Sequence, residues 1–356
     1  MGTAPTIGVE EEFLLVDDRG NLALVGPEVT ERPRRAEGEL QHELARCMVE
    51  SATAVCTTAE QALVALTELR TALAARAAPH GARLLPSGTP VMPEEYQPGL
   101  TPDPRYERMS AHFGALAHTA NTCGQHVHVA VPDRDAGVRV INHLRPWLPL
   151  LLALSANSPF HFGQDTGHAS WRHLMQARWP SAGAPPLFAS LDHYEASVAA
   201  MLRSGAMLDR AMVYWDVRLS EQHPTVEVRV GDVAPTPERA ALLAALARAL
   251  VARALDEPAP APELPGEVLR AGLWRAARDG LSGASPDPRT GEVTPALGQL
   301  HRLVDDLAPE LRAGDDADLV GSLLAGITGC GADLQRAAYS ARGRPVDVVE
   351  ALVTRS

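Results

Sequence analysis

The chain has 356 residues, of which 46% are hydrophobic and 21% charged, and its formal net charge is −12. These proportions are typical of a soluble globular enzyme. The negative charge and the lack of a basic run argue against a nucleic-acid surface. No apolar stretch reaches the roughly 18 residues that a membrane span needs, and no basic segment followed by an apolar one opens the chain. We therefore expect a cytoplasmic protein that binds neither nucleic acid nor membrane.

The cysteines point to the same compartment. Cys47, Cys56, Cys123 and Cys330 are scattered, without the CxxC spacing of a zinc or redox motif. They fit reduced thiols better than a disulfide framework.

The first predicted strand, residues 8–17, carries three consecutive carboxylates, Glu10, Glu11 and Glu12. Side chains alternate faces along a strand, so Glu10 and Glu12 share one face and Glu11 lies on the other. Two carboxylates on one face repel each other unless a cation or a proton lies between them. Hard cations such as Mg²⁺ take oxygen ligands of this kind. Taken alone, the pattern is better explained by a solvated outer face of an edge strand, and only ligands of the same type elsewhere in the chain favour a cation site.

Further elements follow in chain order. We expect a loop over residues 28–39 and a strand over 48–55. A helix should follow, beginning at a capping box formed by Thr57 and Glu60 and ending at about Pro79. Its Arg70 and Arg76 are expected to face outward. A Pro-rich loop over 92–105 precedes a helix over 106–121 and a short strand ending at 132–133. Helices over 135–156, interrupted by prolines, and over 191–203 flank a long loop, 157–186.

The last third of the chain is predicted to be mainly helical. Two strands form a hairpin around residues 221–224, and a helix over 237–255 follows with Thr236 at its N-cap. Helices are expected at about 263–280, 293–312, 316–328, 331–341 and 345–354. We predict one α+β domain, 1–356, with a sheet-bearing core (1–255), a Pro-rich spacer (256–266) and a helical C-terminal portion (267–356).

Two later strands repeat the arrangement of paired polar residues on one face. HVHV puts His126 and His128 on the same face, where such a pair can bind a metal or a phosphate, or can be packed and inert. TVEVRV puts Glu227 and Arg229 on one face and three valines on the other. A buried face seldom carries Glu and Arg unless they pair or bind a ligand. A cross-strand salt bridge is the simpler alternative.

Other charged residues are weaker candidates. Glu50 lies in the predicted strand MVESAT, whereas Glu43, seven residues earlier, fits a surface carboxylate as well as a ligand. Arg172 and Arg178 lie in the long loop, and Arg218 lies in VYWDVRLS, the first strand of the hairpin, two residues after Asp216. Arginine can bind a carboxylate or a phosphate with two parallel hydrogen bonds. No P-loop, GxGxxG, GxSxG or HExxH motif is present, so any nucleotide would bind through metal ions on carboxylates.

Five segments together resemble the carboxylate–amine ligases of the bacterial glutamate–cysteine ligase type 2 family: GVEEEFLLVD, CGQHVHVAVPD, HASWRHLMQARWPSAG, MVYWDVRLSEQHPTVEVRVGDVAPT and LWRAARDGL. That family is similar to the glutamine synthetase superfamily in its catalytic sheet. The resemblance implies a curved antiparallel sheet with flanking helices, whose concave face binds Mg²⁺, or Mn²⁺ in its place, and ATP. It implies that a small-molecule acid is activated as an acyl phosphate and then attacked by an amine.

The resemblance also implies roles for individual residues. The metal ligands would be Glu10, Glu12, Glu43, Glu50, His126 and Glu227; the catalytic arginines would be Arg229 and Arg172; and the nucleotide contacts would be His128, Arg178 and Arg218. Glutamate and cysteine are the default substrates, and a homo-oligomer is allowed. Two alternatives stay open: a metal-dependent hydrolase that needs no ATP, and a non-catalytic relative that binds metal or ligand.

Overall fold

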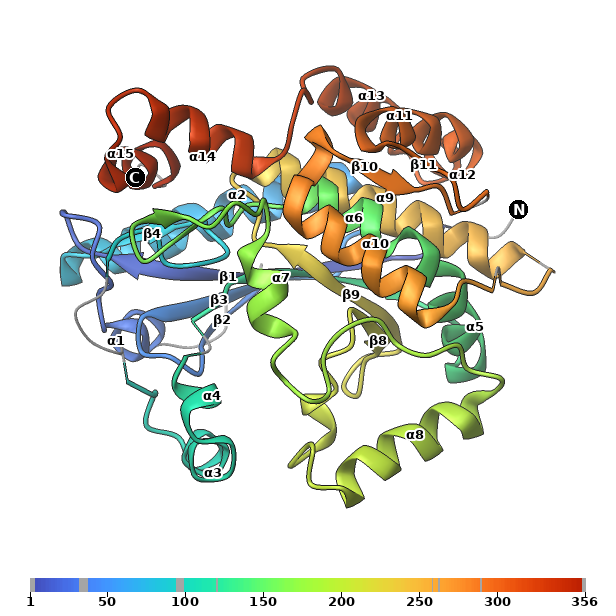
Figure 1. Ribbon diagram of the computed structural model, residues 1–356, viewed down its shortest axis with the longest axis horizontal. Coiled ribbons are helices and arrows are strands. Elements are labelled where there is room, and N and C mark those ends of the chain that lie inside the picture. Colours follow the sequence, from blue (N-terminus) through green and yellow to red (C-terminus); the bar gives the residue numbers. More distant parts are fainter. Residues whose placement is uncertain are drawn as a thin grey trace.

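The computed structural model describes residues 4–31, 38–93, 99–119, 121–257, 259–261, 263–288 and 290–353. Its centre is an antiparallel sheet with the strand order β2-β3-β1-β5-β9-β8, and β4 also pairs with β1 (Figure 1). The strands are β1 (Ile7–Val16), β2 (Gly38–His42), β3 (Met48–Thr53), β4 (Arg83–Leu85), β5 (Gly124–Ala130), β8 (Val217–Leu219) and β9 (Thr225–Asp232). The predicted α+β class and antiparallel sheet are confirmed.

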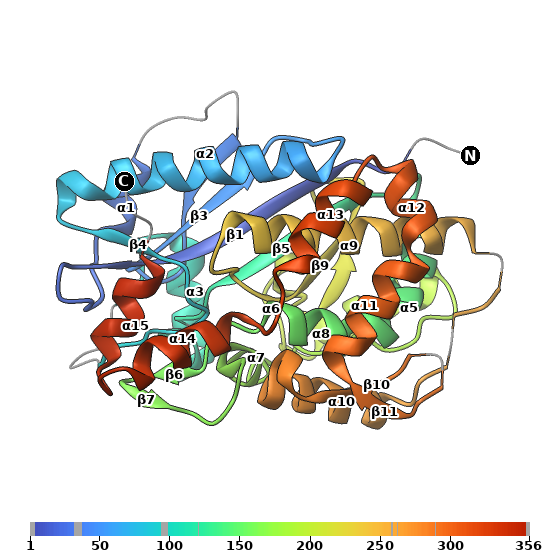
Figure 2. The same ribbon diagram turned by 90° about the horizontal axis from the view of Figure 1, so that it is seen from above.

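Helices cover one face of this sheet. Figures 1 and 2 show α2 (Ala59–Ala77) and α9 (Pro237–Asp256) lying over the strands, and α6 (Leu148–Ser155) packs against β9 beside them. The valines of β5 and β9, such as Val127 and Val228, are buried on this face. The polar residues of the same strands therefore lie on the opposite face, as the period of two requires.

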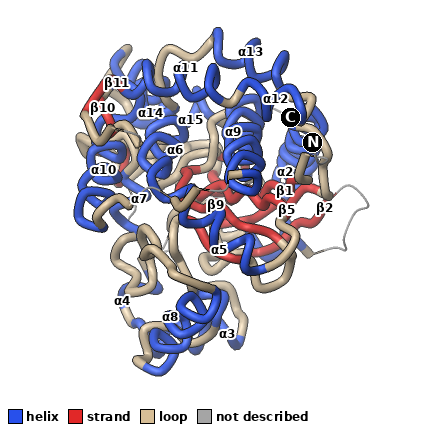
Figure 3. The backbone as a smooth tube through the Cα atoms, turned by 90° about the vertical axis from the view of Figure 1, so that its right-hand side faces the viewer, coloured by secondary structure: helices blue, strands red, loops and turns tan. Residues whose placement is uncertain are grey.

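The opposite face is covered only in part. Figure 3 shows α3 (Pro104–Phe113), α4 (Ala115–His118) and α8 (Leu191–Arg203) on the side of the sheet away from α2 and α9. The other described elements that precede α9 are α1 (Gly26–Thr30), α5 (Arg134–Leu144), which packs against α9, α7 (Trp171–Gln176), the single-turn helices Ala78–His80, Arg145–Trp147 and Arg210–Met212, and the hairpin of β6 (Phe160–His161) and β7 (Gln164–Asp165). The space between the sheet and α3 holds the candidate site.

The C-terminal portion adds helices to the covered side. They are α10 (Gly266–Asp279), α11 (Ala296–Asp306), α12 (Ala308–Ala313), α13 (Ala317–Ala325), α14 (Gly331–Ser340) and α15 (Pro345–Leu352). Leu273 and Leu300 share a buried apolar cluster with strand residues such as Val127, and Val348 shares another with Phe13 of β1. A hairpin of β10 (Ala284–Pro286) and β11 (Val293–Pro295), which the sequence analysis did not predict, interrupts these helices.

Several predicted boundaries were wrong for identifiable reasons. The N-cap of α2 is Thr58, not Thr57, because the Thr58 hydroxyl accepts the Gln61 amide. The predicted helix over 106–121 begins earlier and breaks at Gly114, whose φ of 55° lies in the left-handed region that favours glycine. The predicted loop over 28–39 contains the end of α1 and the start of β2; its residues 32–37 lie outside the described ranges, as do 94–98 of the Pro-rich loop.

One orientation was also wrong. Arg70 of α2 does not face outward: it is buried under the sheet and donates from Nε and Nη2 to the Glu11 carboxylate, at 2.9 Å and 2.5 Å. Glu11 lies on the face of β1 opposite to Glu10 and Glu12, as predicted. Its buried charge requires a cationic partner, and the facing helix supplies one.

Two further observations concern the cysteines and the length of the apolar helices. Cys47, Cys56, Cys123 and Cys330 are buried and form no disulfide with one another. Within the ranges that the structure describes, no helix is long and apolar enough to cross a membrane.

Candidate active site

Neighbouring strands bring the predicted acids and histidines together. In the sheet register, Glu10 lies opposite His126, Glu12 opposite Glu50, and His128 opposite Glu227. Directly opposed residues have their Cβ atoms roughly 5 Å apart, so each pair can share a ligand. A cavity of about 450 Å³ lies beside this face, between the sheet and α3, and its lining includes Glu10, Glu12, Glu43, Glu50, His126, Arg218 and Arg229.

Glu10 lies between the two histidines. Its Oε2 is 3.1 Å from His126 Nδ1, and its Oε1 is 3.2 Å from His128 Nε2. Burial disfavours the charged carboxylate, but the bonds from His126 and His128 outweigh it and hold the pKa of Glu10 well below its usual range. Burial and the charge of Arg229 lower the pKa of His126, so this imidazole is neutral at neutral pH and has a lone pair available.

Glu227 is held by two arginines. Arg218 donates to both of its oxygens, at 2.8 Å and 3.2 Å, and Arg229 donates to Oε1. Although burial opposes ionisation, Arg229 and Arg218 lower the pKa of Glu227, which therefore carries a charge while its side chain is only 2% exposed. The cross-strand salt bridge is thus present, but it opens onto the cavity because Arg218 and Arg229 both line it.

The pKa values of Glu43 and Glu50 are raised, in contrast to the lowered pKa values of Glu10 and Glu227. Glu43 follows β2 rather than lying on a strand, and its own carboxylate accepts the Leu44 amide at 3.1 Å. Burial and the charge of Glu12 raise the pKa of Glu43 to about 7, and burial with the charge of Glu43 raises that of Glu50 well above its usual range. A cation between these carboxylates would remove the repulsion.

The donor atoms fit divalent cations. Among the residues that the structure describes, three groups bring ligand atoms within 4.8 Å of one another: Glu10, Glu50 and His126; Glu10, His128 and Glu227; and Glu12, Glu43 and Glu50. His126 Nε2 is buried and has no hydrogen-bond partner among the described residues, as expected of an atom positioned to bind a ligand. The all-carboxylate group suits Mg²⁺, and the histidine-containing groups also suit Mn²⁺.

Arg172 and Arg178 lie outside the lining of this cavity, and each has other partners among the described residues. Arg172 is buried in α7 against the backbone of Gly124, where an added Cβ would lie only 2.1 Å from Nη2. The Gly124 amide in turn donates to Glu12 Oε2 at 2.6 Å. Arg178 is exposed and donates to the carbonyl oxygens of Met175 and Thr119. Among the described residues that line the cavity neither arginine occurs, so their roles stay predictions.

The sequence analysis missed the wall of the cavity opposite the sheet. It includes Arg105, Tyr106 and Met109 of α3, together with Trp179 and Tyr214, whose rings meet edge to face with centroids 5.4 Å apart. Tyr214 in VYWDVRLS and Trp179 in HASWRHLMQARWPSAG were usable signals, because both aromatic residues lie in segments that carry candidate site residues. The contribution of α3 could not be predicted, because the segment that precedes this helix reads as an irregular loop.

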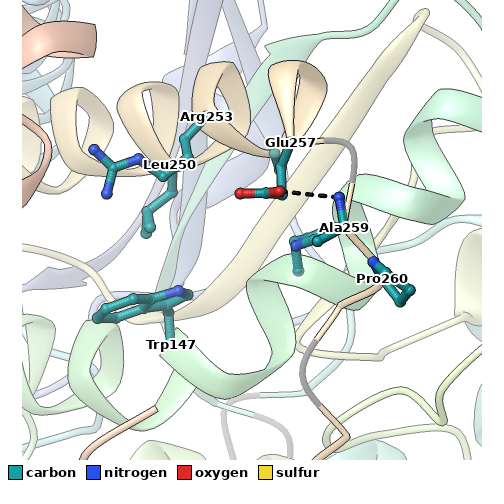
Figure 4. Close-up of a pocket in the computed structure, with 8 residues that line it drawn as sticks. Trp147, Leu250, Arg253, Glu257, Ala259 and Pro260 are labelled. Carbon is teal, nitrogen blue, oxygen red and sulfur yellow. Dashed lines mark hydrogen bonds between the residues drawn. The ribbon is translucent and has the colours of Figure 1, made fainter. Parts of the chain in front are cut away.

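A second pocket lies at the C-terminal end of α9 (Figure 4). It has a volume of about 230 Å³ and is lined by Trp147, Leu250, Arg253, Glu257 and neighbours, and Figure 4 shows Glu257 accepting the Ala259 amide. None of the carboxylates on the open face of the sheet reaches it. The cavity beside the sheet, which these carboxylates line, is therefore the candidate active site.

Solved structures share this fold. A glutamate–cysteine ligase from Francisella tularensis, in complex with AMP, matches with a TM-score of 0.70 and 16% identity over 99% of this chain and 88% of its own. A bifunctional glutathione synthetase from Pasteurella multocida matches with a TM-score of 0.70 and 15% identity over 98% of this chain and 52% of its own. The fold is therefore that of the glutamate–cysteine ligases, and the predicted glutamine synthetase-like architecture is confirmed.

The sequence defines the family more narrowly. The model of glutamate–cysteine ligase family 2 matches residues 6–349, and the chain belongs to this family. A Rhodococcus jostii protein, provisionally named glutamate–cysteine ligase 2-1, is 50% identical over 354 residues, covering 98% of this chain and 96% of its own length. A Mycobacterium protein (strain KMS), provisionally named glutamate–cysteine ligase 2-2, is 46% identical over 360 residues, covering 99% and 98%. Membership places the chain among carbon–nitrogen ligases.

Proposed function

We propose that this protein is an ATP-dependent ligase that joins glutamate to cysteine through an amide bond, giving γ-glutamylcysteine, ADP and phosphate. The observation that carries the proposal is the meeting of Glu10, Glu12, His126, Glu227 and Arg229 on one sheet face beside the cavity. The family and the names of its members supply the substrates.

A carboxylate reacts poorly with an amine because it has no good leaving group. Phosphorylation of one carboxylate oxygen supplies that leaving group. A γ-carboxylate oxygen of glutamate attacks the γ-phosphorus of ATP, and the bond to ADP breaks. The amine nitrogen of cysteine then attacks the acyl carbon, phosphate leaves with the bridging oxygen, and the nitrogen loses a proton. Phosphoryl transfer of this kind depends mainly on positioning and on charge stabilisation.

Residues of this chain would supply both the positioning and the charge stabilisation. Arg229 has its pKa raised, since burial is outweighed by Glu227 and Glu12, and it stays charged beside the cavity. It would offset the charge that develops on the transferred phosphoryl group. Arg218 and His128 would contact the nucleotide phosphates, and Glu10, Glu12, Glu43, Glu50, His126 and Glu227 would hold Mg²⁺ or Mn²⁺. Bound there, these cations would neutralise triphosphate charge and stabilise the leaving ADP.

The two remaining arginines have different proposed roles. Arg172 would orient Glu12 indirectly, because it packs on Gly124, whose amide donates to Glu12. Arg178 would contact the nucleotide only if it exchanged its present carbonyl partners for a phosphate.

The decisive assay is ADP release measured with each substrate omitted in turn. We expect ADP only when glutamate, cysteine, ATP and Mg²⁺ are all present, and no release after EDTA treatment. ADP formed without any acid would contradict a ligase. Metal-dependent hydrolysis of substrates without ATP would favour the hydrolase alternative, and metal binding with no turnover on any acid–amine pair would favour the non-catalytic one.

The substrates require a separate test. A screen of acids with hydroxylamine, read by mass spectrometry, should give a hydroxamate from glutamate. If hydroxamate forms from another acid but never from glutamate, the substrate assignment fails while the ligase class stands.

A further inference from the structure

The hairpin between β8 and β9 contacts His128 at Nδ1, the ring nitrogen that does not face the acids. Thr225, the first residue of β9, places its Oγ1 2.9 Å from His128 Nδ1. The His223 ring packs edge-on against the His128 ring, with centroids 5.8 Å apart. The other nitrogen of His128, Nε2, lies 3.2 Å from Glu10 Oε1. His128 therefore has one nitrogen facing the hairpin and the other facing the acids.

The chemistry of imidazole makes the choice of proton position consequential. A neutral histidine has one N–H and one lone pair, and the hydrogen bond made by one nitrogen decides which is which. Histidines that bind metals nearly always donate their other N–H to an oxygen, which fixes both the tautomer and the ring orientation. Within the described part of the chain, the Thr225 hydroxyl oxygen has no other hydrogen-bond partner, so it is free to accept.

We propose that Thr225 is a positioning residue: its hydroxyl accepts the His128 Nδ1 proton and thereby presents the Nε2 lone pair to a divalent cation held with Glu10 and Glu227. This inference rests on the proposed function and changes one role in it: His128 would bind a cation together with Glu10 and Glu227 instead of contacting the nucleotide phosphates directly. The position of Thr225 follows from the strand: it lies on the same face as Glu227 and Arg229, and its neighbour in the register is Ala130, two residues from His128.

The plain alternative is that Thr225 is a β-branched residue suited to a strand, whose contact with His128 has no consequence. Two substitutions separate these explanations. Thr225→Val keeps the β-branched shape and removes the acceptor, whereas Thr225→Ser keeps the acceptor and removes a methyl group. A matched control is Thr53→Val in β3, because the Thr53 hydroxyl accepts the Val9 amide at 3.0 Å in the same sheet and touches neither histidine.

The test uses Mn²⁺ alone, without ATP, and measures its affinity by electron paramagnetic resonance. Loss of such an outer-shell partner typically lowers metal affinity about 10–100-fold. We expect this loss in Thr225→Val, near-normal affinity in Thr225→Ser, and no change in Thr53→Val. Proton–nitrogen correlation spectra of labelled histidine, recorded with Mg²⁺, should show the Nδ1–H tautomer for His128 in the wild type.

The outcomes are distinct. If the wild-type protein binds no Mn²⁺, the proposed function loses its metal site. If the wild type binds Mn²⁺ and Thr225→Val binds it equally well, only the role of Thr225 is overturned. An Nε2–H tautomer in the wild type would also overturn it, because the lone pair would then face Thr225. A loss in Thr225→Ser as large as in Thr225→Val would indicate that packing, not the hydroxyl, matters.

Discussion

The buried pair of Glu11 and Arg70 offers a prediction whose size follows from the structure. The side chains are 0% and 3% exposed, and Arg70 also donates to the carbonyl oxygen of Ala234 at 2.8 Å. Replacing Arg70 with Met keeps much of the volume but leaves the Glu11 carboxylate buried without a cation. Removing one partner of a buried pair costs about 3–5 kcal/mol, far more than the 0–1 kcal/mol of a surface pair.

The assay is urea unfolding of Arg70→Met, of the double variant Glu11→Leu with Arg70→Met, and of Arg76→Met as a control. Arg76 lies on the same helix and donates to the neutral carbonyl of Val29, so its loss removes a single hydrogen bond and leaves no buried charge unpaired, a cost of about 1.5 kcal/mol. We expect the single Arg70 variant to lose about 3–5 kcal/mol and the double variant to recover most of it, because two apolar groups can replace a buried pair.

Two results would refute this reasoning. A loss below about 1 kcal/mol in Arg70→Met would mean that the pair behaves like one at the surface. A double variant no more stable than the single one would mean that the cost does not arise from an unpaired charge. The prediction bears on the site because Glu11 anchors β1 between the two residues, Glu10 and Glu12, that face the cavity.

Three further predictions concern single side chains. Arg229→Lys should lower turnover by about 10²–10³ with an unchanged thermal melt, since Lys keeps the charge but not the planar fork; near-normal turnover would remove Arg229 from the mechanism. Glu227→Gln should shift the Mg²⁺ requirement of ADP release upward, and an unchanged titration would count against Glu227 as a ligand. Burial raises the pKa of Asp216 from 3.8 to about 7, although the charges of Arg172 and Arg229 oppose this shift. The stability that the protonated Asp216 carboxyl contributes is therefore fully present below pH 3.8 and is lost as the pH rises to about 7. Unfolding measured from pH 4 to 8 should therefore lose stability less steeply in Asp216→Asn, and parallel curves would contradict this.

The period of two in strands accounts for what the sequence predicted well. It placed Glu10 with Glu12, His126 with His128, and Glu227 with Arg229, and the structure brings these three pairs to one face. The alternation depends only on local geometry, so it can be read without knowing which strands are neighbours.

The errors arise where a residue's surroundings are set by distant parts of the chain. The helical pattern of α2 could not show that Arg70 faces inward, because the reason is a carboxylate 59 residues earlier. The positions of Arg172 and Arg178 depend on where α7 packs, and the wall formed by Tyr106, Trp179 and Tyr214 depends on how α3 folds over the sheet. No local signal carries such information.

The central claim is that glutamate is activated by phosphorylation of its side-chain carboxylate. The most direct measurement uses glutamate labelled with oxygen-18 in that carboxylate, with cysteine, ATP and Mg²⁺, and follows the label by mass spectrometry. Since the bridging oxygen leaves with the phosphate, we predict one labelled oxygen in each phosphate released as γ-glutamylcysteine forms. Unlabelled phosphate, or label appearing in AMP, would contradict the account.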